Sequence, residues 1–231
     1  MTLLAFDTCF DGCSVCLAQR QEGGVVALAS AMERFETGHA ERLVPMIGEA
    51  MERAGLAFAD IDEIAVTIGP GTFTGTRIGI AAARSFALAT GARTGGYSSL
   101  AVMAEVARRH IASDLMAVVV DARRGEVYAQ LFGRDGGRQP LSPPQLLKTS
   151  EAAIIGGSER ITFVGSAASA VIEAAVASGR PAEAALPDLL PDAVALAHIA
   201  AAGVPSEGPL VPLYLRPPDA RPQEGKAIAR V

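Results

Sequence analysis

Several features are missing from this sequence of 231 residues. It has no tryptophan or asparagine, only three cysteines and three histidines, and no long hydrophobic run. Its apolar stretches stay below the roughly 20 residues that cross a bilayer, so we expect no membrane-spanning helix. The N-terminus has no basic region and reaches an acid at Asp7, which argues against a secretory signal peptide. We therefore expect a cytoplasmic protein with reduced cysteines and no membrane partner.

Positive charge is also scarce. The 20 lysines and arginines are outnumbered by 25 acidic residues, which gives a net charge of -5. A protein that holds nucleic acid by itself needs a basic surface, so any contact with RNA is expected to require a partner. Hydrophobic residues make up 50% of the chain, enough for a sizeable core in one large or two small domains.

Metal ligands and nucleophile motifs are lacking as well. The histidines, His39, His110 and His198, are far apart, and none has a second histidine four residues later, so no metal site is predicted. His39 lies beside Glu41 at the start of a predicted helix and is interpreted as a local polar cap or a partner contact. The absence of Gly-x-Ser-x-Gly excludes the nucleophile motif of an α/β-hydrolase.

The three cysteines have a suggestive spacing. Cys9, Cys13 and Cys16 form a C-x3-C-x2-C pattern, which resembles the cluster-binding signature of radical S-adenosylmethionine enzymes. Such a site needs a loop that wraps one iron–sulfur cluster. Cys13 and Cys16 lie instead in a predicted strand, where an offset of three directs them to opposite faces. Core packing is the favoured interpretation, and an iron–sulfur radical enzyme remains a remote alternative.

The stretch from Gly69 to Ala89 organises the rest of the chain. A β-branched run, Ile61 to Ile68, predicts a strand that stops at Gly69-Pro70-Gly71. A helix follows, with Thr74 or Thr76 expected to cap its start. Its predicted core face consists of the residues at helical spacing, Ile78, Ala82, Ser85, Phe86 and Ala89.

A glycine-rich turn before a helix can bind an anion, but this one fits no phosphate-loop pattern. We interpret it as a tightly packed loop, with ligand binding as the alternative. The residues assigned to this structural loop are Gly69, Pro70, Gly71, Thr74, Gly75 and Arg77.

The two halves of the sequence resemble each other. A strand at Thr2 to Phe6 ends at Asp7 and returns, and a strand at Leu115 to Val120 ends at Asp121 and returns through Glu126 to Phe132. Such self-similarity predicts a duplicated domain. The other expected elements are strands at Cys13–Ala18, Val25–Ser30, Arg93–Tyr97 and Ile161–Val164, and helices at His39–Ala54, Ser98–His110, Ser166–Ser178 and Pro191–Ala202.

This duplication predicts two lobes. Residues 1–110 form the first and residues 111–216 the second, with the extended tail 210–216 as a candidate to pack back on the first lobe. The charged, proline-containing residues 217–231 are predicted to be disordered.

The paired acidic turns resemble those of the actin-like ATPase and sugar kinase superfamily, in which two hairpins cradle nucleotide phosphates and Mg²⁺. Asp7, Thr8 and Asp121 are therefore weak candidates for cofactor binding. Arg123 and Arg124 stand where small residues would let backbone amides approach a phosphate. A small-molecule kinase or ATPase is the main alternative function, whereas in a structural interpretation both acids cap turns.

Five segments together resemble the bacterial TsaB (YeaZ) family of tRNA threonylcarbamoyladenosine biosynthesis. They are FDTCFDGCSVCLA, HAERLVPMI, IAVTIGPGTFTGTRIGIAAARSFALA, GGYSSL and VVVDARRGEVYAQLF. The resemblance implies a two-lobed actin-like α/β fold, a duplicated ribonuclease H-like motif with mixed sheets flanked by helices. Cys9 departs from the family, which usually has serine there.

The resemblance also implies a non-catalytic subunit. Its partner would be the paralogue TsaD, which holds ATP and a metal and modifies the adenosine next to the anticodon. TsaE and tRNA would join only through the TsaB–TsaD complex, and the chain alone would form a homodimer. TsaD holds its metal through His-x-x-x-His, but Leu43 follows His39 at that spacing, so neither a catalytic residue nor peptidase activity is expected.

The family implies that a pair of helices, His39–Ala54 and Thr74–Thr90, binds the partner. Each helix has more apolar or small surface than one core-facing stripe requires. The predicted interface comprises His39, Arg42, Leu43, Met46, Ile47, Ala50, Gly79, Ala82, Ala83 and Phe86. Arginine at Ala83 is expected to block association and leave the monomer folded.

Overall fold

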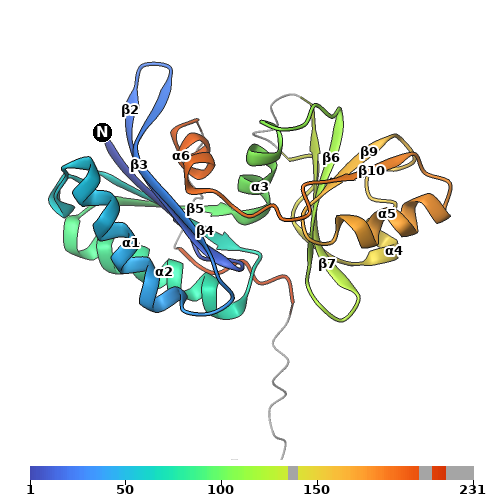
Figure 1. Ribbon diagram of the computed structural model, residues 1–231, viewed down its shortest axis with the longest axis horizontal. Coiled ribbons are helices and arrows are strands. Elements are labelled where there is room, and N and C mark those ends of the chain that lie inside the picture. Colours follow the sequence, from blue (N-terminus) through green and yellow to red (C-terminus); the bar gives the residue numbers. More distant parts are fainter. Residues whose placement is uncertain (135–139, 203–209, 217–231) are drawn as a thin grey trace, which may run out of the picture.

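The computed structural model describes residues 1–134, 140–202 and 210–216. It contains two five-stranded sheets, each flanked by helices (Figure 1). The predicted disordered segment 217–231 lies outside the described residues.

The first sheet has the strand order β3-β2-β1-β4-β5. Its strands are β1 (Thr2–Asp7), β2 (Gly12–Gln21), β3 (Gly24–Arg34), β4 (Glu63–Gly69) and β5 (Arg93–Ser98). β2 runs antiparallel to β1 and β3, whereas β4 runs parallel to β1 and β5. One face packs on α1 (His39–Ala54) and α2 (Phe73–Thr90), with the short helix η1 (Phe58–Asp60) between α1 and β4 in the sequence.

The second sheet repeats this plan in the order β8-β7-β6-β9-β10. Its strands are β6 (Leu115–Asp121), β7 (Glu126–Gly133), β8 (Gln145–Lys148), β9 (Ile161–Val164) and β10 (Ala182–Ala185). Strand directions match those of the first sheet pair by pair. One face packs on α4 (Thr149–Ala152) and α5 (Ala168–Ala177). The predicted duplication and the two-lobed α/β fold class are confirmed.

Helix α3 (Ser99–Ala107) joins the two halves because it contacts both sheets. Val102 packs in the core of the first lobe beside Leu3 and Ala5. On another side of the same helix, Leu100 and Met103 pack in a cluster that includes residues of β6 and β7. The lobes therefore share an apolar contact and are not merely linked by loops.

The last helix departs from the predicted assignment of residues 111–216 to the second lobe. α6 (Ala193–Ala202) follows the second lobe in sequence but packs on the first sheet. Arg20 on β2 fixes its end, donating to the carbonyls of Ala200 and Ala201 at 2.8 and 2.7 Å while also pairing with Glu63 at 2.9 Å. A buried, apolar face on the first sheet thus determines where this helix lies.

The ends of most strongly periodic helices and strands lie within a few residues of their predicted positions, and α1 spans the predicted range. The start of α2 differs from the prediction. Thr72 caps the helix, instead of Thr74 or Thr76, by accepting a hydrogen bond from the Gly75 N–H at 3.1 Å. The predicted core face of α2 is correct only in part: Ile78, Ala82 and Phe86 are partly buried against the first-lobe core, but Ser85 and Ala89 are exposed. Its buried stripe is Gly75, Thr76, Gly79, Ile80 and Ala83.

Candidate functional site

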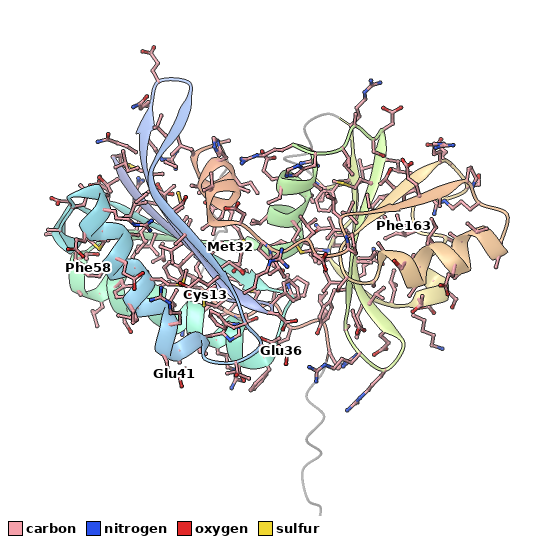
Figure 2. The ribbon with its side chains drawn as sticks, in the orientation of Figure 1. Cys13, Met32, Glu36, Glu41, Phe58 and Phe163 are labelled. Carbon is pink, nitrogen blue, oxygen red and sulfur yellow. The ribbon has the colours of Figure 1, made fainter. Side chains whose placement is uncertain are left out.

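The three cysteine thiols are buried in different parts of the core. Cys13 packs between the first sheet and α1, as Figure 2 shows, and Cys16 lies on the opposite face beside α6. Cys9 belongs to the cluster around α3. Burial raises the pKa of Cys13 and Cys16 to about 12 and raises the pKa of Cys9 further. This separation contradicts a shared iron–sulfur cluster, and the described residues contain no cluster of three or more His, Cys, Asp or Glu side chains that could hold a metal ion.

The first acidic turn is directed into the protein. Asp7 is 2% exposed, and its Oδ1 accepts hydrogen bonds from the Thr67 hydroxyl and from the Cys9 N–H. Burial raises the pKa of Asp7 to about 6, although these hydrogen bonds oppose the rise. Asp7 thus serves as a buried acceptor that joins β1 to β4.

The glycine-rich loop closes over this turn. The Thr72 N–H donates to the Cys9 carbonyl at 2.7 Å, and the Thr8 hydroxyl donates to the Gly75 carbonyl at 2.7 Å. A Cβ at Gly71 would lie 2.5 Å from the Cys9 carbonyl oxygen, and a Cβ at Gly75 would overlap the Thr8 carbonyl oxygen. Glycine is therefore required for close backbone approach, which supports the packing interpretation of the loop.

The remaining loop residues have mixed roles. Gly69 has a φ of 105°, a conformation that favours glycine, and the Gly69–Pro70 peptide bond is cis. Thr74 is exposed and makes no cap. Arg77 stacks on Phe73, with its guanidinium carbon 3.7 Å from the ring centre.

The second acidic turn faces solvent. Asp121 is exposed, and its Oδ1 accepts the Arg123 N–H at 2.7 Å. Its own N–H donates to the Ser166 hydroxyl at 3.0 Å. Both acids therefore accept the N–H two residues later and cap their turns, as the structural interpretation predicts. The side chains do not meet in one phosphate clamp.

A cleft of about 550 Å³ lies beside these turns. The first lobe contributes Phe10, Asp11, Arg34, Phe35, Glu36 and Thr72 to its walls, and the second contributes Val120, Asp121, Arg123 and Ser166. Asp7 and Thr8 are not among the lining residues. The cleft thus presents a mixture of acids, arginines and apolar side chains, with only one of the three cofactor candidates.

The predicted partner interface is mostly internal. Leu43, Met46, Ile47, Ala50 and Ala83 are 0–1% exposed in the first-lobe core. Gly79 faces Thr8, and the His39 ring nitrogen Nε2 lies 2.7 Å from the Phe10 carbonyl. Only Arg42, Ala82 and Phe86 retain partial exposure. The apolar residues selected from the sequence form the core stripes of both helices, so a partner cannot reach most of them.

The outward faces of α1 and α2 form a different surface, which we call the α1–α2 face. Its members recur at spacings of three or four residues and are all exposed: Glu41, Val44, Gly48 and Glu52 on α1, and Arg77, Ala81, Arg84 and Leu88 on α2. Leu88 is 90% exposed and Val44 is 51% exposed. Figure 2 shows Glu41 at the surface of α1.

The α1–α2 face has an uneven charge. α2 contains two arginines and no acidic residue, whereas α1 contains three glutamates and two arginines. Arg42 pairs with Glu33 and Glu49, which leaves Glu41 and Glu52 at the ends of the outward stripe. This charge difference is visible in the sequence and could have located the surface.

Two copies of one sheet plan, each with an acidic turn after its central strand and packed around a shared helix, define a two-lobed actin-like α/β protein. No described helix is long and apolar enough to cross a membrane.

Comparison with known proteins identifies the family within this fold class. A family model described as "TsaD: tRNA N6-adenosine threonylcarbamoyltransferase" matches residues 16–201. The tRNA threonylcarbamoyladenosine biosynthesis protein TsaB of Escherichia coli is 37% identical over 135 residues, which cover 58% of this chain and 56% of that protein. An uncharacterized protein of Mycobacterium tuberculosis is 33% identical over 223 residues, covering 96% of this chain and 94% of that protein.

A solved structure is similar over a greater length than the Escherichia coli match. YeaZ from Pseudomonas aeruginosa is 31% identical with a TM-score of 0.77, and the match covers 93% of this chain and 99% of that chain. The chain belongs to the TsaB (YeaZ) family.

Proposed function

We propose that this chain is a non-catalytic subunit of bacterial tRNA threonylcarbamoyladenosine synthesis that supports TsaD. The observation that carries the proposal is the exposed α1–α2 face, joined to the names of the relatives. TsaD binds this face, and a second copy of the chain occupies it when TsaD is absent. ATP and the catalytic metal belong to TsaD, while TsaE and tRNA join through the TsaB–TsaD complex.

The geometry of the two turns supports a non-catalytic role. The polar groups of the Asp7–Cys9 turn bond to Thr67, Thr72 and Gly75 inside the lobe, so they are not directed at a nucleotide. A kinase or ATPase is the alternative function. Micromolar binding of ATP with Mg²⁺ in calorimetry on the lone protein, with turnover of a hydroxylated substrate, would favour it.

The chemistry of the α1–α2 face supports docking of another helix pair. Small residues at Gly48 and Ala81 permit close helix approach, and Leu88 offers an apolar anchor. In a symmetric dimer each contact occurs twice, so α1 acids of one copy can meet α2 arginines of the other. We expect roughly 1,200–2,000 Å² of buried surface if the interface has standard size.

Two neighbouring alanines allow a sharp test. Ala81 is exposed and Ala83 is 0% exposed. Ala81→Arg should keep the wild-type melting temperature and abolish both self-association and binding to TsaD, because it adds bulk and charge where helices meet. Ala83→Arg should unfold the protein, which corrects the expectation from the sequence. Light scattering and pull-down with TsaD measure the two associations.

An arginine elsewhere supplies the matched control. Ala170 is an exposed alanine on α5 of the second lobe, and Ala170→Arg should leave both associations intact. Normal dimerisation and normal TsaD binding by folded Ala81→Arg would place the interface on another surface.

A further inference from the structure

The segment 210–216 runs along the first lobe and reaches the second (Figure 1). Leu210 is 7% exposed in the first-lobe core, and the Leu213 N–H donates to the Ile68 carbonyl at 2.7 Å. Tyr214 stacks on Phe73 at 5.7 Å between ring centres, and its hydroxyl accepts from Arg77 Nε at 2.6 Å. Core burial, a backbone hydrogen bond and a stacked ring therefore anchor this segment to β4 and α2.

The other end of the segment binds the second lobe. Arg216 Nη2 donates to Glu126 Oε2 at 2.5 Å and lies 3.5 Å from the Arg123 carbonyl oxygen. Glu126 is the first residue of β7 and follows the turn that begins at Asp121. Seven residues thus connect the loop before α2 with the second acidic turn.

The lobes have a second contact, which is apolar. Leu100 and Met103 of α3 pack in one cluster with Met116 and Val118 of β6. In Figure 1, α3 and the segment 210–216 lie on opposite sides of the region where the two lobes approach each other. The cleft beside the acidic turns is lined by both lobes. A rotation of the lobes about α3 would widen this cleft and separate Arg216 from Glu126.

We propose that the segment 210–216 is an inter-lobe tie, which fixes the separation of the lobes and has the Arg216–Glu126 pair as its releasable end. The two ends differ in kind. The Leu210 end is buried, whereas the paired side chains at the other end are 23% and 34% exposed. Partly exposed ion pairs weaken as salt screens them, so the pair can break while both lobes remain folded.

Distance measurement between spin labels tests the tie. The native cysteines are 0–1% exposed, so labels can be placed at introduced cysteines, Ser30→Cys in the first lobe and Glu173→Cys in the second, both exposed in the native chain. Dilution with unlabelled protein removes distances between chains. The wild-type chain should give a narrow distribution, and Glu126→Gln or Arg216→Gln should broaden it toward longer distances.

The matched control breaks an ion pair within one lobe. Asp114 pairs with Arg134 at 3.0 Å, and Asp114→Asn should leave the distribution unchanged. The double variant Glu126→Arg with Arg216→Glu should restore the narrow distribution. About 1 M salt, where the Debye length is about 3 Å, should broaden the wild-type distribution as the single variants do.

Circular dichroism tests whether each labelled variant is folded. If Glu126→Gln does not fold, Arg216→Gln decides the question, because Arg216 lies beyond the buried anchors of the segment. A wild-type distribution in folded Arg216→Gln would overturn the proposal, and so would a single narrow distribution at all salt concentrations.

Discussion

The two acidic turns occupy equivalent positions in the duplicated lobes but have opposite environments. Asp7 and Asp121 each end a central strand, and each accepts the N–H of the residue two positions later. Asp7 is nevertheless 2% exposed, whereas Asp121 faces the solvent beside the inter-lobe cleft. The same position in the fold has therefore become part of the core in one lobe and part of the surface in the other.

The loop that follows the neighbouring parallel strand explains the difference. Gly69, the last residue of β4, and Gly165, which follows β9, share a φ of 105°, so the backbone turns in the same way at the end of both strands. In the first lobe the loop and the 18-residue α2 then close over Thr8 and Cys9. In the second lobe the 10-residue α5 begins at Ala168, and the loop before it bonds to β6 itself: the Ala167 N–H donates to the Val119 carbonyl at 3.2 Å, and the Ser166 hydroxyl accepts the Asp121 N–H at 3.0 Å. The close packing that Gly71, Gly75 and Gly79 permit thus covers the first acidic turn, and we call this packing the seal.

The largest effect should come from breaking that seal. Gly75→Val should lower the free energy of unfolding by more than about 4 kcal/mol or prevent folding, because its side chain would overlap the Thr8 backbone. Gly125→Ala in the second turn should cost only about 1 kcal/mol, because Gly125 has a positive φ but open space around it. Urea denaturation of both variants measures the difference. A wild-type midpoint for Gly75→Val would show that the loop is not a packing element.

This seal could be predicted from the sequence only in part. The string Gly-Pro-Gly followed by small residues predicts a strand, a tight loop and a helix, but almost every residue of α2 is small or apolar, so periodicity cannot select its buried side. The predicted face was wrong at Ser85 and Ala89 for this reason. Thr72 was missed as the cap because Thr74 and Thr76 are equally suitable residue types.

The second lobe was harder to predict for another reason. β8, α4 and β10 have four residues each, too few to display a period. β10 also consists of Ala-Glu-Ala-Ala, a composition that does not favour strands, and it is formed because β9 supplies a partner. Most of the α1 residues predicted for the partner interface are buried in the first-lobe core, because the sequence identifies apolar residues but not which of them the lobe's own core uses.

The burial of Asp7 also makes the stability of the fold depend on pH. The pKa of Asp7 rises from 3.8 to about 6 on burial, so the folded state favours the protonated carboxyl. Its stabilising contribution is complete below pH 3.8 and is lost as the pH rises through about 6, a loss of roughly 3 kcal/mol at most. Asp7→Asn retains an oxygen acceptor for Thr67 and Cys9, and it should reduce the fall in stability between about pH 4 and pH 7.

Asp121→Asn is the matched control at the exposed turn. Denaturation midpoints of both variants and the wild-type chain across this pH range provide the measurement. Equal pH dependence in Asp7→Asn and wild type would mean that the buried carboxyl does not control stability in this range.

The smallest effect should come from improving the exposed turn. Arg124 and Gly125 have φ values of 59° and 74° between Arg123 and Glu126, whose N–H donates to the Arg123 carbonyl at 3.1 Å. Two positive φ values at the centre of a hairpin turn are typical of type I′, for which Asn-Gly is the favoured pair. Arg124→Asn creates that pair and should raise the free energy of unfolding by up to about 1 kcal/mol, because arginine is disfavoured at positive φ. Thr74→Asn, at an exposed position of α2, is the control. It should not raise the free energy of unfolding in the same urea titration, because asparagine stabilises only where the backbone has a positive φ. A destabilised Arg124→Asn protein would indicate that the arginine side chain contributes more to the open turn than its backbone conformation costs.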